Sequence, residues 1–173
     1  MKKLEDLLSF KGVPSTRELD WAAARSLVGG SLPTDYTKFV QQHGSGSIDD
    51  FLWILVPGCS NPNLDLVTVC PQMQEAVEEM RRMFGNDIPY SHESLVPWGI
   101  TDNGDVCFWH TVGSEPDDWH VVAADTRMSD WEAHECGFES YLCGVLNRTI
   151  YSDAMGDEWL EANSTCHYYR YGQ

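Results

Sequence analysis

An Asn103-Gly104 pair between two strand-forming segments restricts the fold of this chain more than any other feature of its sequence. Asn-Gly favours the tight turn of a two-residue β-hairpin, because both residues accept the positive φ angles that such turns need. Leu95–Trp98 precedes the pair, and Val106–Val112 follows it as a strand. An acidic turn over residues 113–118 then leads into Trp119–Ala124, which again has strand-forming residues. We therefore expect a three-stranded antiparallel meander.

Helical patterns lie on both sides of this meander, with apolar residues spaced to form one face of each helix. The clearest helix spans Pro71–Phe84, where a stripe of methionines indicates core packing. A last amphipathic helix is expected over Phe138–Leu146, and one or two strands are expected between Gly46 and Val56. Shorter helices are expected near the N-terminus, over Lys3–Phe10, from the capping residues Ser15 and Thr16 to Val28, and in the segment where Leu32, Tyr36, Phe39 and Val40 share one face before Gly44 ends the helix.

These patterns predict a single α+β domain over residues 1–173, with a mostly antiparallel central sheet of five or six strands flanked by helices. A length of 173 residues suits one domain with one core. We place the core of the domain at about residues 21–147. Residues 151–173 form an acidic and aromatic C-terminal extension, for which we expect one more helix and a tail.

The charge balance of the chain indicates which class of partner it can bind. Eleven lysine and arginine residues stand against 27 aspartate and glutamate residues, which gives a formal net charge of −16. Such a field repels nucleic-acid phosphates and anionic lipid head groups, so we expect neither nucleic acid nor membrane as a partner. A basic protein is the natural complement of this charge.

The N-terminus and the apolar runs favour a cytoplasmic protein. Met1–Asp6 turns acidic where a signal peptide would have its apolar segment. The longest apolar stretch, Phe51–Pro57, is too short to span a bilayer. We therefore expect the six cysteines to be free thiols in a reducing compartment.

Clusters of acidic residues and two of the seven tryptophans are the candidate partner-binding residues. Aromatic side chains often dominate protein interfaces, and we expect one or two tryptophans, with Trp109 or Trp131 as the candidates, to be exposed as anchors, while most tryptophans lie in the core or on a half-buried sheet face. The competing interpretation of each acidic cluster is a solvated surface that keeps the protein soluble. The candidate acids are Asp49, Asp50, Glu115, Asp117, Asp118, Asp130 and Glu132.

The sequence contains weak signs of catalytic or metal chemistry. Cys166-His167 and the His134–Cys136 segment supply the residue types of a thiol nucleophile with its base, or of zinc ligands. Neither pair has the spacing of a zinc ribbon, and Gly44-Ser45-Gly46 lacks the third glycine of a dinucleotide-binding loop. We therefore assign no catalytic residue, no metal and no cofactor from the sequence.

Several local motifs follow one another between about Trp21 and Asn147. They are Leu32-Pro33 with Tyr36, Phe39 and Val40; Gly44, Gly46 and Ile48; Pro97-Trp98-Gly99; Asn103-Gly104-Asp105; Trp109; and Trp119. Their order resembles that of the SUKH superfamily, the cell-wall-assembly-regulator-like domains. No family pattern fits Phe51–Pro71, Trp131–Cys136 or the tail after Ile150.

The resemblance implies a non-catalytic immunity protein that binds and silences a polymorphic or contact-dependent toxin in the bacterial cytoplasm. A nuclease toxin must carry a positive site for phosphates, which an acidic surface can match. Two alternatives stay open. One is a regulatory scaffold of the same fold with an endogenous partner, and the other is a small Cys/His hydrolase. The oligomeric state and the toxin's identity are not encoded in any feature that we recognise.

Overall fold

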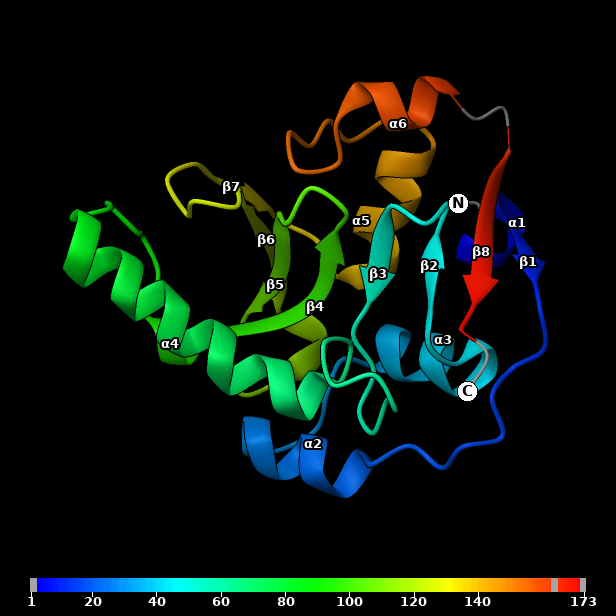
Figure 1. Cartoon of the computed structure of the whole chain (residues 1–173), viewed down its shortest axis with the longest axis horizontal. Helices are drawn as coiled ribbons and strands as arrows, with labels where there is room; N and C mark the ends of the chain where they lie inside the picture. The colour runs from blue at the N-terminus through cyan, green and yellow to red at the C-terminus, as the bar shows by residue number, and fades with distance from the viewer. Residues whose placement is uncertain (1–2, 163–164, 172–173) are drawn as a thin grey trace.

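The computed structural model describes residues 3–162 and 165–171, and its elements are drawn in Figure 1. The helices are α1 (Leu4–Leu7), α2 (Trp21–Val28), α3 (Thr34–His43), α4 (Leu66–Phe84), α5 (Phe138–Leu146) and α6 (Asp157–Ala162), with short 3-10 turns η1 (His92–Ser94) and η2 (Pro116–Asp118). The strands are β1 (Leu8–Lys11), β2 (Gly46–Ile48), β3 (Leu52–Ile54), β4 (Leu95–Thr101), β5 (Val106–His110), β6 (His120–Ala124), β7 (Trp131–His134) and β8 (Cys166–Arg170).

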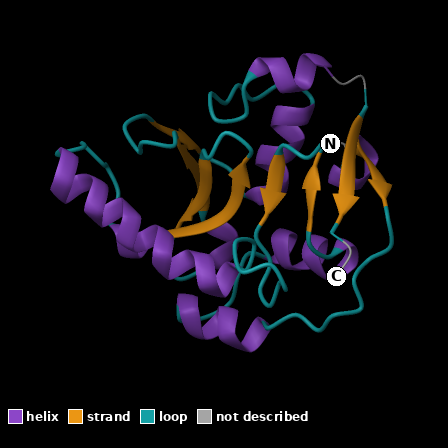
Figure 2. Ribbon diagram, in the orientation of Figure 1, coloured by secondary structure: helices purple, strands orange, loops and turns teal. Residues whose placement is uncertain are grey.

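The strands form one sheet in the order β1-β8-β2-β3-β4-β5-β6-β7 (Figure 2). Every neighbouring pair is antiparallel except β1 and β8, which run parallel. The expected class, a single α+β domain with a mostly antiparallel sheet, is confirmed. The sheet is larger than expected, because the described residues contain eight strands and not five or six.

The meander is present as β4, β5 and β6, but its first turn differs from the prediction. Gly104 N–H donates to the Thr101 carbonyl oxygen, and Thr101 N–H donates to the Asp105 carbonyl oxygen. Within the turn only Gly104 has a positive φ, at 87°. The hairpin therefore has a three-residue loop that ends in a left-handed glycine, and not the predicted two-residue turn.

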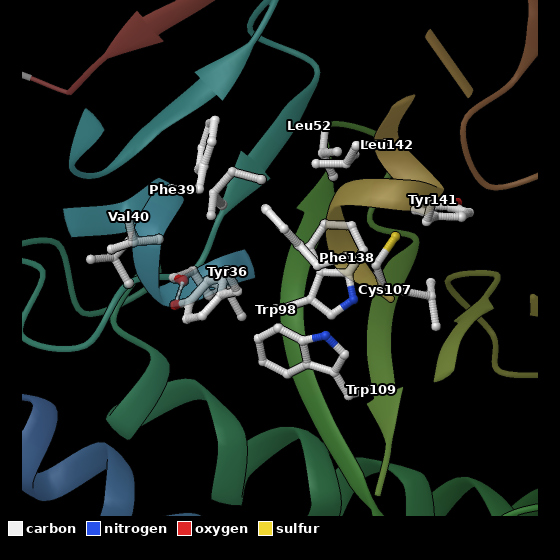
Figure 3. Close-up of a cluster of buried hydrophobic side chains, with 14 of the residues drawn as sticks. Tyr36, Phe39, Val40, Leu52, Trp98, Cys107, Trp109, Phe138, Tyr141 and Leu142 are labelled. Atoms are coloured by element: carbon white, nitrogen blue, oxygen red, sulfur yellow. Dashed lines mark hydrogen bonds between the residues drawn. The ribbon is translucent and has the colours of Figure 1, made fainter. Parts of the chain in front are cut away.

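Two hydrophobic clusters cover opposite faces of β5 and β6. Cys107 and Trp109 pack in the large cluster with α3 and α5, whereas Phe108 packs in a smaller cluster beneath α4. Likewise, Val121 packs in the large cluster and Val122 packs in the smaller one. Figure 3 shows the large cluster, in which side chains of the sheet meet those of α3 and α5. Because both faces of these strands are buried, their sequences are apolar apart from His110 and His120 at one end.

Three expected helix boundaries are wrong, each because a different residue caps the helix or the helix is shorter. The segment expected as one helix over Lys3–Phe10 is a single helical turn followed by β1. Asp20, and not Ser15 or Thr16, caps α2 by accepting the Ala23 N–H. Helix α4 begins ahead of Pro71, because Asp65 accepts the N–H groups of Val67 and Thr68.

The C-terminal extension contributes a strand to the interior of the sheet. Strand β8 lies between β1 and β2, where Asp49 N–H donates to the His167 carbonyl oxygen and His167 N–H donates to Asp49 Oδ1. The Tyr168 ring is fully buried, and its hydroxyl donates to the Gly44 carbonyl oxygen. Tyr168, which was expected in a tail, is thus a part of the core, whereas residues 163–164 and 172–173 of that tail lie outside the described residues.

Candidate functional site

A hollow of about 340 Å³ lies at the end of the sheet where β5 begins, β6 ends and β7 begins. Five carboxylates line it, and the described lining residues include no lysine or arginine. Its remaining walls are small alanines and the indole of Trp131. We call this feature the acidic hollow; its carboxylates belong to Asp105, Asp125, Asp130, Glu132 and Asp153.

Local turns fix two of these carboxylates. Asp125 accepts hydrogen bonds from Ser129 N–H, Ser129 Oγ and Asp130 N–H, at 2.7 to 3.0 Å. Burial raises the pKa of Asp125, but these hydrogen bonds outweigh burial and hold the pKa below its usual value of 3.8. Asp105 Oδ1 accepts the Thr126 N–H at 3.0 Å. The turn between β6 and β7 therefore holds anionic groups in place.

Glu132 ties β7 to the segment that follows α5. Its Oε1 accepts hydrogen bonds from Ser152 Oγ at 2.6 Å and from Ala154 N–H at 3.1 Å, and its Oε2 accepts the Asp153 N–H at 3.1 Å. His134 Nε2 lies 3.3 Å from Glu132 Oε2. The Glu132 side chain is 21% exposed. Glu132 thus shapes the hollow and is not a free surface acid.

The same contacts shift the titration of Glu132. Burial raises its pKa, but the neighbouring His134 imidazole and the hydrogen bonds from Ser152 and Ala154 outweigh burial, so the pKa lies below its usual value of 4.5. A folded-state pKa below the unfolded one means that the carboxylate stabilises the fold above the unfolded pKa. This stabilisation is lost as the pH falls through the folded pKa.

We expect Glu132→Gln to lower the free energy of unfolding by about 2 kcal/mol near neutral pH, since hydrogen bonds to a charged acceptor are lost. The difference from the wild type should shrink as the pH falls through the folded-state pKa of Glu132, because the wild-type carboxyl then also becomes neutral. Urea unfolding of both proteins over a pH series measures this difference. Glu135→Gln, at an exposed position just after β7, is the control and should match the wild type. A Glu132→Gln effect that stays constant with pH would show that the charge is not what stabilises this contact.

Trp131 forms an apolar wall of the hollow. Its indole N–H donates to the Met128 carbonyl oxygen at 3.0 Å, and its ring stacks on Phe108 with 5.7 Å between ring centroids. The residue is half-buried, so one part of the ring supports the smaller core cluster while another part stays accessible.

Several candidate residues from the sequence have other roles. The expectation that Trp109 is an exposed anchor is wrong: it is fully buried, because it faces α3 and α5. The Asp49 side chain is only 4% exposed and holds β8 in place, so it is no surface acid. Asp117 accepts the N–H and hydroxyl of Thr34 at 2.6 and 2.9 Å and thereby caps α3. Asp50 is exposed, and its Oδ1 accepts the Ser47 hydroxyl.

The acidic hollow brings together Asp130, Trp131 and Glu132 from the sequence prediction. Glu115, just before η2, and Asp118, its last residue, are exposed ahead of β6, whereas the hollow lies where β6 ends. The two acidic regions are therefore at opposite ends of that strand. Sequence reasoning missed Asp105, Asp125 and Asp153, although the Asn-Gly-Asp turn carried Asp105 as a visible signal.

The cysteine and histidine pairs do not form an activated nucleophile. Cys166 and His167 are consecutive in β8, so their side chains leave opposite faces of the sheet. Burial, together with the nearby Asp49 carboxylate, raises the pKa of the Cys166 thiol to about 12. Burial also raises the pKa of Cys136. Both thiols are therefore neutral near pH 7, unlike a catalytic thiolate.

Two features are absent from residues 3–162 and 165–171, namely a metal-binding cluster and a membrane-spanning helix. No cluster of three or more histidine, cysteine, aspartate or glutamate side chains there is arranged to hold a metal ion. None of the helices in that part of the chain is both long enough and apolar enough to cross a membrane.

A SUKH family model, described as SMI1-KNR4 cell-wall, matches residues 18–142. The matched region runs from just before α2 into α5 and contains β2 to β7, whereas β1 and β8 lie outside it. Neither the curated proteins nor the solved structures contain a significant match to the chain.

Proposed function

The chain belongs to the SUKH family, because the family model matches residues 18–142, and we propose from this that it is an immunity protein. In this role it binds and neutralises a cognate toxin. The family includes toxin immunity proteins, and its members generally bind proteins. In this proposal the protein acts in the bacterial cytoplasm, without catalysis and without a cofactor. Its partner is a basic, nuclease-type toxin domain of a polymorphic or contact-dependent system.

The acidic hollow is the observation that carries this proposal. Five carboxylates line one concave site in a chain of net charge −16. A nuclease must expose positive groups that bind phosphates, so the two surfaces are complementary. Long-range attraction between them accelerates association, which an immunity protein needs in order to act before its toxin does damage.

The proposed mechanism is occlusion. The fixed carboxylates of Asp105 and Asp125 take the positions that phosphates would occupy against the toxin's cationic groups, and Trp131 supplies an apolar contact at the rim. Because the turn already orders these groups, binding costs little side-chain entropy. The toxin's site is blocked for as long as the complex lasts, and no bond is made or broken.

Co-purification from the native lysate tests the function. Tagged protein is used to retain partners at low and at moderate salt, and the retained polypeptides are identified by mass spectrometry. We expect one basic polypeptide whose toxic activity falls on addition of this protein, with weaker retention at moderate salt because salt screens exposed charges. Retention of a non-toxic endogenous protein instead would replace the immunity function with the scaffold alternative.

Matched charge variants locate the binding surface. Asp130 and Asp153 are exposed in the hollow, whereas Glu115 and Asp118 are exposed at the other end of β6. We expect Asp130→Asn with Asp153→Asn to weaken partner binding about tenfold, and Glu115→Gln with Asp118→Asn to change it less than about twofold. Both double variants remove two charges, so they differ in position alone. A larger loss of binding for Glu115→Gln with Asp118→Asn would show that the interface lies at η2 instead.

A further inference from the structure

Strand β7 is an edge of the sheet with unused backbone groups. It pairs with β6 alone within the part of the chain that the structure describes. Asp125 N–H donates to the Asp130 carbonyl oxygen, and Val121 N–H donates to the Cys136 carbonyl oxygen. Because ladder bonds alternate along an antiparallel pair, the N–H and C=O groups of Trp131 and Ala133 therefore turn away from β6. Such an edge can accept a further strand.

The segment after α5 leaves this ladder open. Ser152, Asp153 and Ala154 contact the side-chain carboxylate of Glu132. Side chains project from the faces of a sheet and not along its hydrogen-bonding direction. The segment therefore lies over one face of β7. It forms a wall of the hollow and does not lie in the place that an added strand would take.

The two edges of the sheet differ in charge, which indicates what kind of strand fits each. The opposite edge, β1, carries Lys11, and the Arg170 guanidinium donates to the neighbouring Gly12 carbonyl oxygen. Strand β7 carries Glu132, with exposed Asp130 before it and exposed Glu135 after it. A second copy that paired through its own β7 would bring the same acids to this edge, where like charges repel.

We propose that the edge of β7 receives an extended, lysine- or arginine-bearing segment of the partner protein. The segment adds a ninth strand through backbone hydrogen bonds to Trp131 and Ala133, and it places a cationic side chain in the acidic hollow. The backbone ladder contributes affinity, and the hollow selects for positive charge. This inference rests on the proposed function and assigns the form of the partner's contact.

A peptide titration tests the edge directly. The probe is a short capped peptide in which lysine and valine alternate, and the readout is the amide NMR spectrum of the isotope-labelled, full-length protein. We expect the largest shifts at Trp131–His134, with the amides of β1 unchanged as an internal control. A peptide with the same sequence but N-methylated on alternate residues keeps the charge and lacks the backbone N–H groups that would pair with β7. We expect it to bind about tenfold more weakly.

Two variants separate backbone pairing from charge. Ala133→Pro removes an outward N–H at an exposed edge position, where proline is tolerated, and should weaken binding of the unmethylated peptide about tenfold. The double variant Asp130→Asn with Asp153→Asn should lower the affinity of both peptides by the same factor. It should also make that affinity less dependent on salt. Thermal unfolding of Ala133→Pro checks that this variant is folded. The N-methylated peptide tests the same loss of a backbone hydrogen bond with the wild-type protein.

Three outcomes would overturn the inference: no shifts at β7, equal binding of the two peptides, or shifts in the free protein that depend on its own concentration and so indicate pairing with a second copy. These failures are distinct from failure of the proposed function. If the lysate partner is retained equally by the wild type and by Ala133→Pro, the immunity function stands and the β7 contact does not. If no toxin is retained while the peptide pairs with β7, the edge is a binding site of another kind of protein.

Discussion

Trp109→Ala is expected to lower the free energy of unfolding by about 3–5 kcal/mol, because it leaves a large cavity in the core. The Trp109 ring is fully buried between the sheet and α3, with its centroid 4.8 Å from that of Tyr36 and 6.3 Å from that of Trp98. For a domain of this size the loss corresponds to a fall in melting temperature of about 10 °C. Calorimetry or denaturant unfolding measures it. An unchanged midpoint would mean that the ring is not in the core.

Trp109→Phe distinguishes a core role from a binding role at the same position. It keeps most of the apolar volume and should weaken partner binding less than about twofold, since the ring does not reach the surface. Trp131→Phe at the hollow is its matched counterpart, because it keeps an aromatic ring but loses the indole N–H that donates to Met128. A larger loss of affinity for Trp109→Phe than for Trp131→Phe would restore Trp109 as a determinant of binding.

Gly46→Ala is expected to be the second most damaging substitution, with a loss of about 3 kcal/mol of stability or more. A methyl group built at Gly46 would collide with the Tyr169 carbonyl oxygen and lie 2.8 Å from carbons of the Tyr168 ring. The first of these neighbours is backbone and the second is a fully buried ring, so neither can yield without separating β2 from β8. Denaturant unfolding and amide hydrogen exchange at β8 measure the effect, and exchange at β8 should rise the most.

Gly30→Ala is the matched control. No atom lies within 4 Å of a methyl group built there, and its φ is not in the left-handed region. Gly30→Ala should therefore change stability by less than about 0.5 kcal/mol. Equal effects at the two glycines would show that the close approach of β2 and β8 does not determine the cost.

The elements predicted correctly are those whose patterns are local. Asn103-Gly104 lies in a real hairpin, and Phe138–Leu146 is a helix with the predicted bounds. Strands β1, β7 and β8 were not predicted. The pairing of β1 with β8 joins distant segments and depends on tertiary packing, and Trp131–Cys136, which contains β7, matched no pattern. The helical spacing of Leu4, Leu7 and Leu8 arises where a short helix passes directly into a strand. A pattern of apolar residues alone does not separate these cases.

The candidate site was predicted in part, for a similar reason. Net charge identified the kind of surface, and Asp130, Trp131 and Glu132 are adjacent in sequence. Asp105, Asp125 and Asp153 join them only through the register of β5 and β6 and through the contacts of Glu132 with the segment after α5. Trp109 was placed on the surface because periodicity does not identify a strand that is buried on both faces.

The position of β8 between β1 and β2 sets the order in which the molecule can be built during translation. Arg170 and Gly12, which are 158 residues apart, are joined by a hydrogen bond across this junction. Among the described strands β1 pairs with β8 alone, so β1 has no partner strand until β8 has left the ribosome. The meander has only short connections and can form earlier. In the growing chain the edge of β2 that pairs with β8 therefore stays open until β8 has been synthesised.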